Sequence, residues 1–277
     1  MTPAQEEDAS ITTSESDAEA EGVFDGLFDD AIGLNNDVGN AGSGIFYGRG
    51  DNIDTLHPGV PRCFTIDTIH LSSTSFFPVK YIINFGQTGC TGPDGRTRRG
   101  KINIIYSGRI MLAGSTATTT FDGFYVDDIK VEGLHVVTNT SSPVNTQPIV
   151  RQFKIDVTAA RLTKPNGNYT TWDSHKIVTQ MEGIITPDPR DDIFKITGNA
   201  GGRVKRGTLL VGWESEITEP LIRRITCRWI VKGRIRTRKL NNATNSPWIA
   251  LLDFGTGTCD DQATIVINGV SHQITLP

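Results

Sequence analysis

A chain of 277 residues can hold one large all-β domain or two small domains, and it is long enough to bury a substantial core without metals or disulfides. Hydrophobic residues make up 37% of the chain and the mean hydropathy is -0.23, values typical of a soluble globular protein. No run of about eighteen apolar residues occurs, so the sequence excludes a helix that spans a membrane.

The net charge of -4 conceals an uneven distribution of charge along the chain. Residues 1–48 contain eleven acidic residues and no Lys or Arg, whereas the rest of the chain has 27 basic and 20 acidic residues, a net charge of +7. An acidic N-terminal segment therefore precedes a basic body.

The N-terminal region divides into three parts. Residues 1–21 are mostly Ser, Thr, Ala, Glu and Asp, and we expect a disordered acidic spacer because they have little apolar surface to bury. Residues 22–34 place apolar side chains at helical spacing, which predicts a short amphipathic helix that either docks on the body or serves as a handle for another protein. Residues 35–61 are rich in Gly and Asn and are predicted to be a linker.

Residues 62–277 are predicted to form a single β domain. Polar and apolar residues alternate through most of this region, no long helical pattern interrupts it, and turn signals such as Asp122-Gly123 and Asn268-Gly269 separate the strands. We therefore expect an all-β fold: a large antiparallel meander of about a dozen strands, arranged as a sandwich or as a rolled, elongated sheet, with the short helix at its N-terminus. The clearest strands are predicted at residues 79–85, 101–106, 124–126, 129–131, 153–157, 193–196, 209–213 and 263–267.

The four cysteines are arranged around a short sequence that occurs twice. Residues 83–90 (INFGQTGC) are echoed by residues 252–259 (LDFGTGTC), and two further cysteines stand upstream of the two copies. We interpret the phrase as a strand that runs into a glycine turn, used once at each end of the β body. The matching frames indicate either two disulfides or four buried thiols, and the spacing lacks the C-x-x-C of a zinc site. For a protein outside the cytosol we favour the disulfides Cys63–Cys90 and Cys227–Cys259.

Four stretches of the body resemble a known family. Residues 85–102 (FGQTGCTGPDGRTRRGKI) are similar to the central signature of a family of uncharacterised Bacteroidetes lipoproteins, and residues 118–133 resemble the part that follows it. Residues 227–233 and 252–260 resemble the end of the domain, so the resemblance covers about residues 63–276. It implies a leader, a lipidated cysteine, an acidic spacer with a short helix and then the β domain. The family implies no established activity and no catalytic residues.

The main charged feature of the body is a basic strand predicted after Cys227. Its cations stand at even positions and apolar residues at odd ones, which places the charges on one face of the strand. This face is either simply solvated or a docking surface for an anionic partner, such as a polysaccharide, a lipid headgroup or the acidic tail of the protein itself. We do not expect nucleic acid, because the stripe lacks stacking aromatics. The candidate binding residues are Arg228, Lys232, Arg234, Arg236 and Arg238 with Trp248 as the exposed aromatic. Arg223, Arg224 and Lys239 extend the basic charge, and Arg96, Arg98, Arg99 and Lys101 form a second cluster.

No catalytic or metal-binding constellation is recognisable. The five histidines are scattered singly and no G-x-S-x-G occurs, so we assign no catalytic residue, no metal and no cofactor. A carbohydrate-active module is the alternative: Glu132, Glu182, Glu214 and Glu216 could supply the paired carboxylates of a glycosidase, and tryptophans could stack on sugars.

Together these features predict a non-enzymatic cell-envelope lipoprotein that presents a β-rich structural or binding surface, with a carbohydrate-binding or carbohydrate-active module as the alternative. The expected location of the mature form is the periplasm or the cell surface, in association with the outer membrane. Residues 1–4 lack the basic and apolar regions of a signal peptide, so a cytoplasmic location is the other interpretation. The expected partners are an anionic polysaccharide or another envelope protein, with membrane contact only through a lipid anchor outside this chain.

Overall fold

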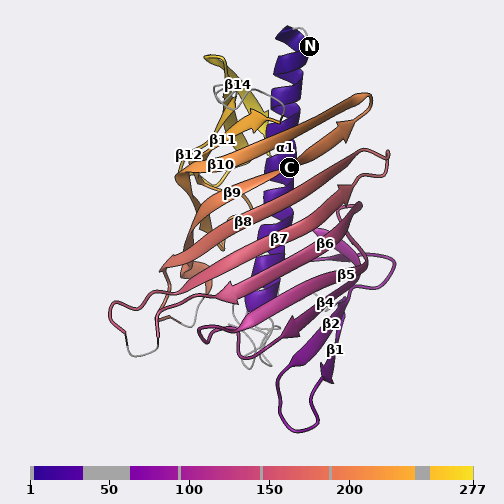
Figure 1. The fold of residues 1–277 in the computed structure, drawn as a ribbon, viewed down its shortest axis with the longest axis vertical. Coiled ribbons are helices and arrows are strands. Elements are labelled where there is room, and N and C mark those ends of the chain that lie inside the picture. The colour runs from indigo at the N-terminus through magenta and orange to yellow at the C-terminus, as the bar shows by residue number, and fades with distance from the viewer. Residues whose placement is uncertain are drawn as a thin grey trace.

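One long helix and one sheet make up the described part of the chain (Figure 1). The computed structural model describes residues 3–33, 63–92, 95–143, 146–186, 189–240 and 250–276, so the predicted linker at 35–61 lies outside them. The elements are α1 (Pro3–Ile32), β1 (Thr65–His70), β2 (Val79–Asn84), β3 (Cys90–Thr91), β4 (Thr97–Tyr106), β5 (Thr116–Val126), β6 (Ile129–Asn139), β7 (Gln152–Thr163), β8 (Tyr169–Glu182), β9 (Ile193–Arg206), β10 (Leu209–Arg224), β11 (Lys232–Lys239), β12 (Ala250–Thr256), β13 (Gln262–Ile267) and β14 (Val270–Thr275), with a single 3-10 turn (Pro189–Asp191) before β9.

The strands form one antiparallel sheet in chain order. Neighbours in the sequence are neighbours in the sheet from β1 to β14, and the short β3 lies off this path and pairs with β4. Side chains alternate between buried and more exposed positions along the strands, as in β2 and β13. The predicted all-β antiparallel meander is confirmed, and its form is one rolled sheet rather than a sandwich.

Two predicted turns have different outcomes. Asn268-Gly269 joins β13 to β14 with φ values of 50° and 84°, as a two-residue hairpin requires, so that turn is confirmed. Asp122-Gly123 is not a turn, because it lies inside β5 where the strand bulges. A Cβ atom on Gly100 of β4 would collide with the backbone of Gly123, so this pair of glycines permits a close approach of adjacent strands instead of a chain reversal.

Bulges give the sheet its curvature. Register shifts interrupt most of the long strand pairs, and each shift bends the strand that carries it. Two of them fall at Gly133 and Gly233, which have φ values of 125° and 118° and lie where a side chain would meet the backbone of the adjacent strand. The curvature creates a concave face that runs the length of the sheet (Figure 1).

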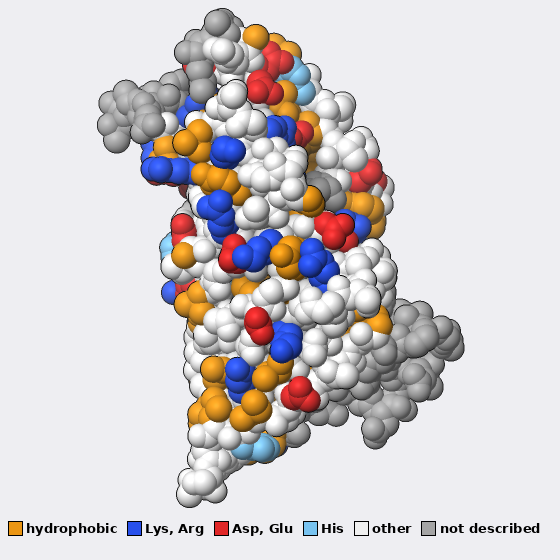
Figure 2. Space-filling view, turned by 90° about the vertical axis from the view of Figure 1, so that its right-hand side faces the viewer, with side chains coloured by type: hydrophobic (Ala, Val, Ile, Leu, Met, Phe, Trp, Pro, Cys, Tyr) orange, Lys and Arg blue, Asp and Glu red, His pale blue; other side chains and the backbone are white. Residues whose placement is uncertain are grey.

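The outer surface carries charges of both signs. Figure 2 shows one side of the molecule, on which Lys and Arg side chains lie among Asp and Glu and small apolar groups. No large field of one charge covers this side, so the net positive charge of the body is not displayed here as a basic patch.

The concave face holds α1, which is longer than predicted. The prediction of a disordered spacer at 1–21 and a separate short helix at 22–34 is wrong, because Pro3–Ile32 is one helix. No residue from Ala9 to Gly33 is exposed, and the helix contacts β5, β6 and β8 to β13. The composition of this segment misleads because its polar side chains are buried against charged and aromatic partners that are distant in the sequence, such as Trp213, which lies 196 residues from Asp17.

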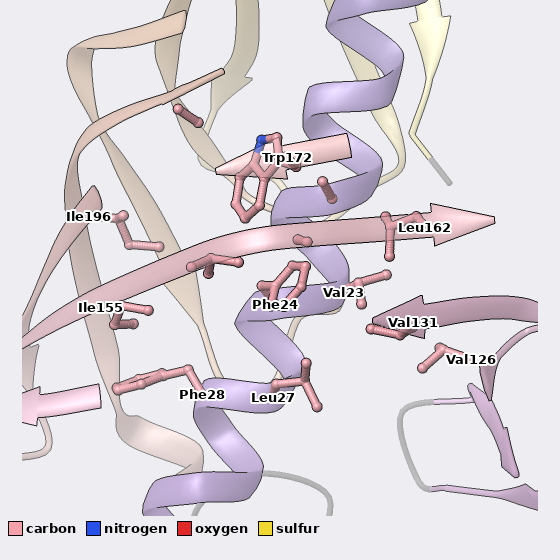
Figure 3. Packing of buried hydrophobic residues seen from close by; sticks show 14 of the residues in the cluster. Val23, Phe24, Leu27, Phe28, Val126, Val131, Ile155, Leu162, Trp172 and Ile196 are labelled. Atoms are coloured by element: carbon pink, nitrogen blue, oxygen red, sulfur yellow. The ribbon is translucent and has the colours of Figure 1, made fainter. Parts of the chain in front are cut away.

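Apolar side chains in the second half of α1 anchor the core (Figure 3). Phe24 stacks on Trp172 with ring centroids 5.4 Å apart, and Phe28 packs edge to face against Phe153 and Phe194 at 5.4 and 5.9 Å. Burial of each such side chain contributes about 1.5–3 kcal/mol, whereas more than half of the residues of the helix are weaker helix formers such as Ser, Thr, Asp and Gly. Around these rings lie Val23, Leu27, Val126, Val131, Ile155, Leu162 and Ile196.

The two copies of the repeated phrase share one hydrogen bond between a side chain and the backbone. The carboxamide oxygen of Asn84 accepts a hydrogen bond from the backbone N–H of Gly86 at 3.0 Å, and a carboxylate oxygen of Asp253 accepts one from Gly255 at 2.9 Å. Both glycines have positive φ, 71° and 89°. The predicted strand followed by a glycine turn is therefore confirmed for the first copy, where Gly86 lies in the turn after β2. It is wrong for the second copy, where β12 continues through Gly255 to Thr256 with a shift in its register to β11.

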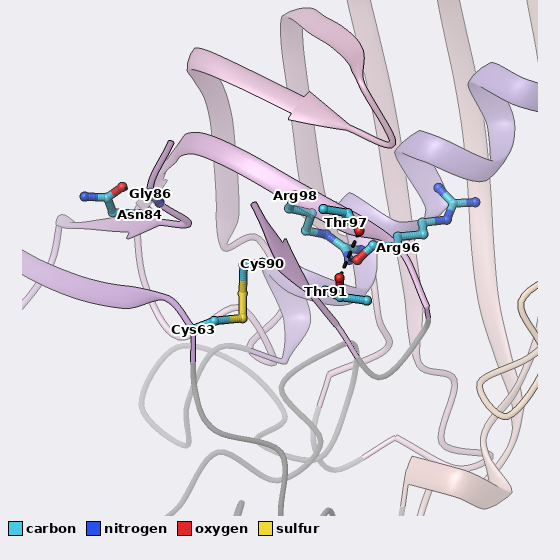
Figure 4. Close-up of a disulfide and its surroundings, with 8 residues drawn as sticks. All are labelled: Cys63, Asn84, Gly86, Cys90, Thr91, Arg96, Thr97 and Arg98. Atoms are coloured by element: carbon cyan, nitrogen blue, oxygen red, sulfur yellow. Dashed lines mark hydrogen bonds between the residues drawn. A yellow bond between two sulfur atoms is a disulfide. The ribbon is translucent and has the colours of Figure 1, made fainter. Parts of the chain in front are cut away.

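Each copy ends at a disulfide. Cys63 and Cys90 are joined with Cα atoms 5.4 Å apart (Figure 4), and Cys227 and Cys259 are joined with Cα atoms 5.8 Å apart. These are the pairs that the sequence favoured. The first bridge joins the start of β1 to β3, and the second joins the segment before β11 to the segment after β12.

Candidate functional site

The predicted basic strand is β11, and its even-numbered cations lie on the outer face of the sheet. Burial alternates strictly along the strand. Gly233, Ile235, Thr237 and Lys239 are buried toward α1, whereas the outward positions are Lys232, Arg234, Arg236 and Arg238. The interpretation of the odd positions as the inner face is thus confirmed, with Lys239 as an inward cation.

Acidic residues of the neighbouring strands neutralise the outer face of β11. Arg234 forms ion pairs of 2.7 Å with Glu219 of β10 and with Asp253 of β12. The Nε of Arg238 donates a 2.8 Å hydrogen bond to Glu214 of β10. Cross-strand pairs of this kind contribute about 0.2–1 kcal/mol each. This face is a ladder of paired charges and not a bare basic stripe.

Of the other predicted binding residues, one stands in this ladder and two do not. Arg236 stands opposite Glu216 in the register of β10 and β11. Arg228 precedes β11 and lies 3.9 Å from Asp127, in the turn between β5 and β6. Trp248 lies outside the described residues. The structure therefore does not bring the predicted set together in one groove.

The inward-facing cations of the sheet bind the acidic residues of α1. We call this arrangement the helix groove and define it by the residues of the sheet that pair with the helix: Lys164, Lys176, Arg206, Arg223, Lys239 and His272. The acidic tail is thus bound by the basic body, mainly through cations other than the even-numbered positions of β11.

The deepest ion pairs lie near the middle and the C-terminal end of α1. The Nζ of Lys176 is 2.8 Å from Oε2 of Glu21, and both side chains are 4% exposed. The guanidinium of Arg223 makes two parallel contacts with the carboxylate of Asp29, one of them a 2.7 Å hydrogen bond from Nη1 to Oδ1. Such bidentate pairing fixes the angle of the helix as well as its position.

Toward the N-terminus the pairs become more exposed. Lys164 lies 2.8 Å from Glu19, and Arg206 lies 2.8 Å from Glu15. The outermost contacts are longer and join Lys239 to Glu6 at 3.6 Å and His272 to Glu7 at 3.5 Å. Exposed pairs contribute little because water competes for both partners, so the buried half of the helix carries most of the electrostatic binding.

Two tryptophans bind one carboxylate of the helix. The indole N–H groups of Trp172 and Trp213 donate to Oδ1 of Asp17 at 2.8 and 3.2 Å. The two side chains are 1% and 0% exposed. They are therefore part of the helix groove and do not form a platform on which a sugar could stack.

Burial shifts the pKa of several groups in the interior, among them Asp25, Glu21, Asp192 and His135. Burial, reinforced by the neighbouring Glu21, raises the pKa of Asp25 to about 7. The pKa of Glu21 is raised by burial more than Lys176 lowers it. The pKa of Asp192 is raised to about 7, by burial first and then by Asp191. Burial lowers the pKa of His135 to about 4, so this histidine is neutral at physiological pH.

Several buried hydroxyl groups in the groove have no hydrogen-bond partner among the described residues. On the helix these are Thr12 and Ser14, and on the strands they are Ser174 and Thr237. A buried polar group without a partner costs about 1–3 kcal/mol. A few deep ion pairs and apolar contacts therefore hold the helix in its groove, and they outweigh the unfavourable burial of these hydroxyl groups.

The carboxylates considered for a glycosidase have other partners or positions. Glu132 lies 2.7 Å from Lys130 of the same strand. Glu214 and Glu216 stand two residues apart on β10 and both line a shallow hollow of the outer face, so they do not face each other across a cleft. No group of three or more His, Cys, Asp or Glu side chains within the described ranges could hold a metal ion.

Comparisons of the chain with protein-family models, with curated proteins and with solved structures find no match. In the part of the chain that the structure describes, no helix combines the length and apolar character that crossing a membrane requires. The fold and the groove define an all-β protein whose curved sheet encloses an acidic N-terminal helix.

Proposed function

We propose that the chain is a non-enzymatic protein of the cell envelope, a lipoprotein in its mature form, whose β body presents a structural or binding surface. The observation that carries the proposal is the occupation of the concave face by α1. The inward-facing cations and tryptophans of the sheet are engaged by the helix, so the surface left for partners is the outer face of the sheet and its edges.

The two disulfides support an extracytoplasmic location. Cys63–Cys90 and Cys227–Cys259 use every cysteine of the chain. Disulfides persist in oxidising compartments such as the periplasm and the cell surface and are rare in the cytosol. The resemblance of residues 63–276 to envelope lipoproteins points the same way. The partners that we propose are an anionic polysaccharide or another envelope protein.

The test is fractionation of the producing cells followed by peptide mapping without reduction. We expect the protein in the envelope fraction, with peptides linked through the two pairs above and no free thiol. Four reduced cysteines on a cytosolic protein would falsify the proposal. Because the bridges close segments separated by 27 and 32 residues, we also expect reduction to lower the free energy of unfolding by about 3–4 kcal/mol per bridge.

A carbohydrate-binding module is the second candidate, and a hollow in the outer face favours it. This hollow has a volume of about 620 Å³ and lies over Gly201 and Gly202 of β9. Its rim is polar, with Asp173, His175 and Asn199 on one side and the glutamates of β10 on the other. Hydrogen-bonding groups around an open backbone suit the hydroxyls of a sugar.

Affinity electrophoresis of the native chain and of two variants, in gels that contain a neutral or an acidic polysaccharide, tests the second candidate. Carbohydrate binding at the hollow predicts retardation that Asn199→Ala weakens and that Asp122→Asn, on another part of the surface, leaves unchanged. Equal mobility of the native protein in all gels would remove the second candidate and leave the structural role.

A further inference from the structure

A cavity of about 210 Å³ lies beside the middle of α1, where two distant parts of the rolled sheet come together. One wall is the turn between β5 and β6, with Asp127 and Ile129, and the opposite wall is the segment before β11, with Arg228 and Trp229. The 3.9 Å ion pair between Arg228 and Asp127 spans the two walls at the partly exposed mouth.

Small residues on the helix leave the space open. Ala18 and Gly22 stand one turn apart and both line the cavity. The remaining walls are mainly apolar and are formed by Val23, Val126, Ile129, Ile230, Phe254 and Leu276. A dry apolar cavity of about 150 Å³ holds a benzene ring, so this one has room for a ring and a short polar group.

Two polar groups of the cavity lack a hydrogen-bond partner in the described structure. The carboxylate of Asp25, 14% exposed, has its nearest cation at 4.0 Å, where Arg223 lies turned toward Asp29. The indole N–H of Trp229 is buried and has no acceptor. The other cations of the wall are engaged, since Arg228 pairs with Asp127 and Arg96 donates to the carbonyl of Gly22 at 3.0 Å. What the carboxylate of Asp25 lacks among the described residues is a hydrogen-bond donor, since Arg223 reaches it only at ion-pair distance.

We propose that this cavity binds a small apolar amine in its ammonium form, with the ammonium group against Asp25 and the apolar body between the helix and the two walls. An ammonium group supplies the hydrogen-bond donors that Asp25 lacks and adds a positive charge to that of Arg223, and the apolar walls accept a ring or a branched alkyl group. This inference goes beyond the proposed function and does not depend on it.

Binding should strengthen as the pH rises through 7. Burial and the negative charge of Glu21 and Asp29 raise the pKa of Asp25 to about 7, whereas Arg223 and Lys176 act in the opposite direction. An ammonium ligand favours the ionised carboxylate, so its affinity follows the ionisation of Asp25. The charged groups around the site are Glu19, Glu21 and Asp29 of α1, Lys176 of β8, Arg223 of β10, Arg96, Arg98, Asp127 and Arg228.

The test is titration of the full chain with three compounds of one shape and different charge: benzylamine, benzyl alcohol and benzoate. Calorimetry and tryptophan fluorescence at pH 6 and pH 8 give the affinities. We expect benzylamine to bind most tightly and to gain about fivefold to tenfold between pH 6 and pH 8. Asp25→Asn should weaken benzylamine at pH 8 by about tenfold or more and leave benzyl alcohol nearly unchanged, because only the charged contact is lost.

Two further variants separate the cavity from the rest of the molecule. Ala18→Leu fills the cavity and should abolish binding of both benzylamine and benzyl alcohol. Asp122→Asn, an exposed carboxylate elsewhere on the sheet, should bind benzylamine like the native chain. Circular dichroism and the unfolding midpoint verify that each variant is folded. Tighter binding of benzoate, equal binding of benzylamine by Asp25→Asn, or no saturable binding by the native chain would each overturn the proposal.

Discussion

Lys176 of β8 and Glu21 of α1 form an ion pair in which both side chains are 4% exposed and the charged atoms lie 2.8 Å apart. The two residues are far apart in the sequence, so the contact exists only when the helix lies in its groove. Removing one partner of such a pair leaves the other charge buried without compensation, which is more costly than never burying the pair.

Lys176→Met should therefore destabilise the protein by about 3–5 kcal/mol, measured as the free energy of unfolding in urea. The double variant Lys176→Met/Glu21→Leu should recover most of this loss, because burial already raises the pKa of Glu21 more than Lys176 lowers it. The matched control is Lys154→Met, which breaks an exposed 2.8 Å pair with Asp156 on the outer face. The control should change stability by less than about 1 kcal/mol. If Lys176→Met and Lys154→Met lower the free energy of unfolding equally, the buried ion pair contributes no more to stability than the exposed one.

Asp17 is the second point at which the helix is fixed, because it accepts hydrogen bonds from both buried tryptophans. Asp17→Ala leaves two indole N–H groups without an acceptor and should cost about 2–4 kcal/mol of unfolding free energy. Asp17→Asn keeps one acceptor oxygen and should cost less. Near-ultraviolet circular dichroism should report the changed environment of Trp172 and Trp213. A stable Asp17→Ala variant with an unchanged tryptophan spectrum would contradict this account of the groove.

The sheet was predictable because its signals are local. Strict alternation marks β2, β11 and β13, and the turn at Asn268-Gly269 carries its own backbone requirement. The repeated phrase was also predictable in part, since Asn84 and Asp253 each accept a hydrogen bond from the backbone of the glycine two residues later. Bulges such as the one at Gly123 were not predictable, because glycine is favoured both in a turn and where two adjacent strands approach closely.

The helix groove was not predictable from local composition. Residues 1–21 look unable to fold because they carry few apolar side chains, yet a groove of complementary charge and two tryptophans accepts them. The sequence did contain one signal, which is that an acidic N-terminal segment precedes a basic body. Three cations of that body, Arg223, Lys239 and Arg96, do contact the helix. A parity argument would have found Lys176, because it shares its strand face with Trp172 and Val178, both of which are buried.

Asp25 makes stability depend on pH in a direction opposite to that of most carboxylates. Its pKa in the folded chain, about 7, is above the ordinary value of 3.8, so its stabilising contribution is complete below about pH 4 and is lost as the pH rises through 7. Asp25→Asn cannot ionise and should be more stable than the native chain at pH 8, by on the order of 2–4 kcal/mol, and nearly equal to it at pH 4. Urea unfolding of both proteins at pH 4, 6 and 8 measures the difference. A constant difference across this range would refute the assignment of the raised pKa to Asp25.

His135 affects stability in the opposite pH direction from Asp25 and should contribute to unfolding in acid. It is fully buried, packs against Phe24 with ring centroids 6.0 Å apart, and neither ring nitrogen has a hydrogen-bond partner among the described residues. Burial lowers its pKa from 6.5 to about 4, so the neutral ring stabilises the fold above pH 6.5 and this contribution is lost as the pH falls toward 4.

His135→Phe removes both the titration and the unsatisfied nitrogens while keeping a ring against Phe24. The variant should be more stable than the native chain throughout, and the gain should widen by about 3 kcal/mol between pH 7 and pH 4. His175→Phe, at an exposed position of β8, is the matched control and should show no such widening. Parallel pH profiles for the native chain and His135→Phe would mean that another group is responsible for the loss of stability in acid.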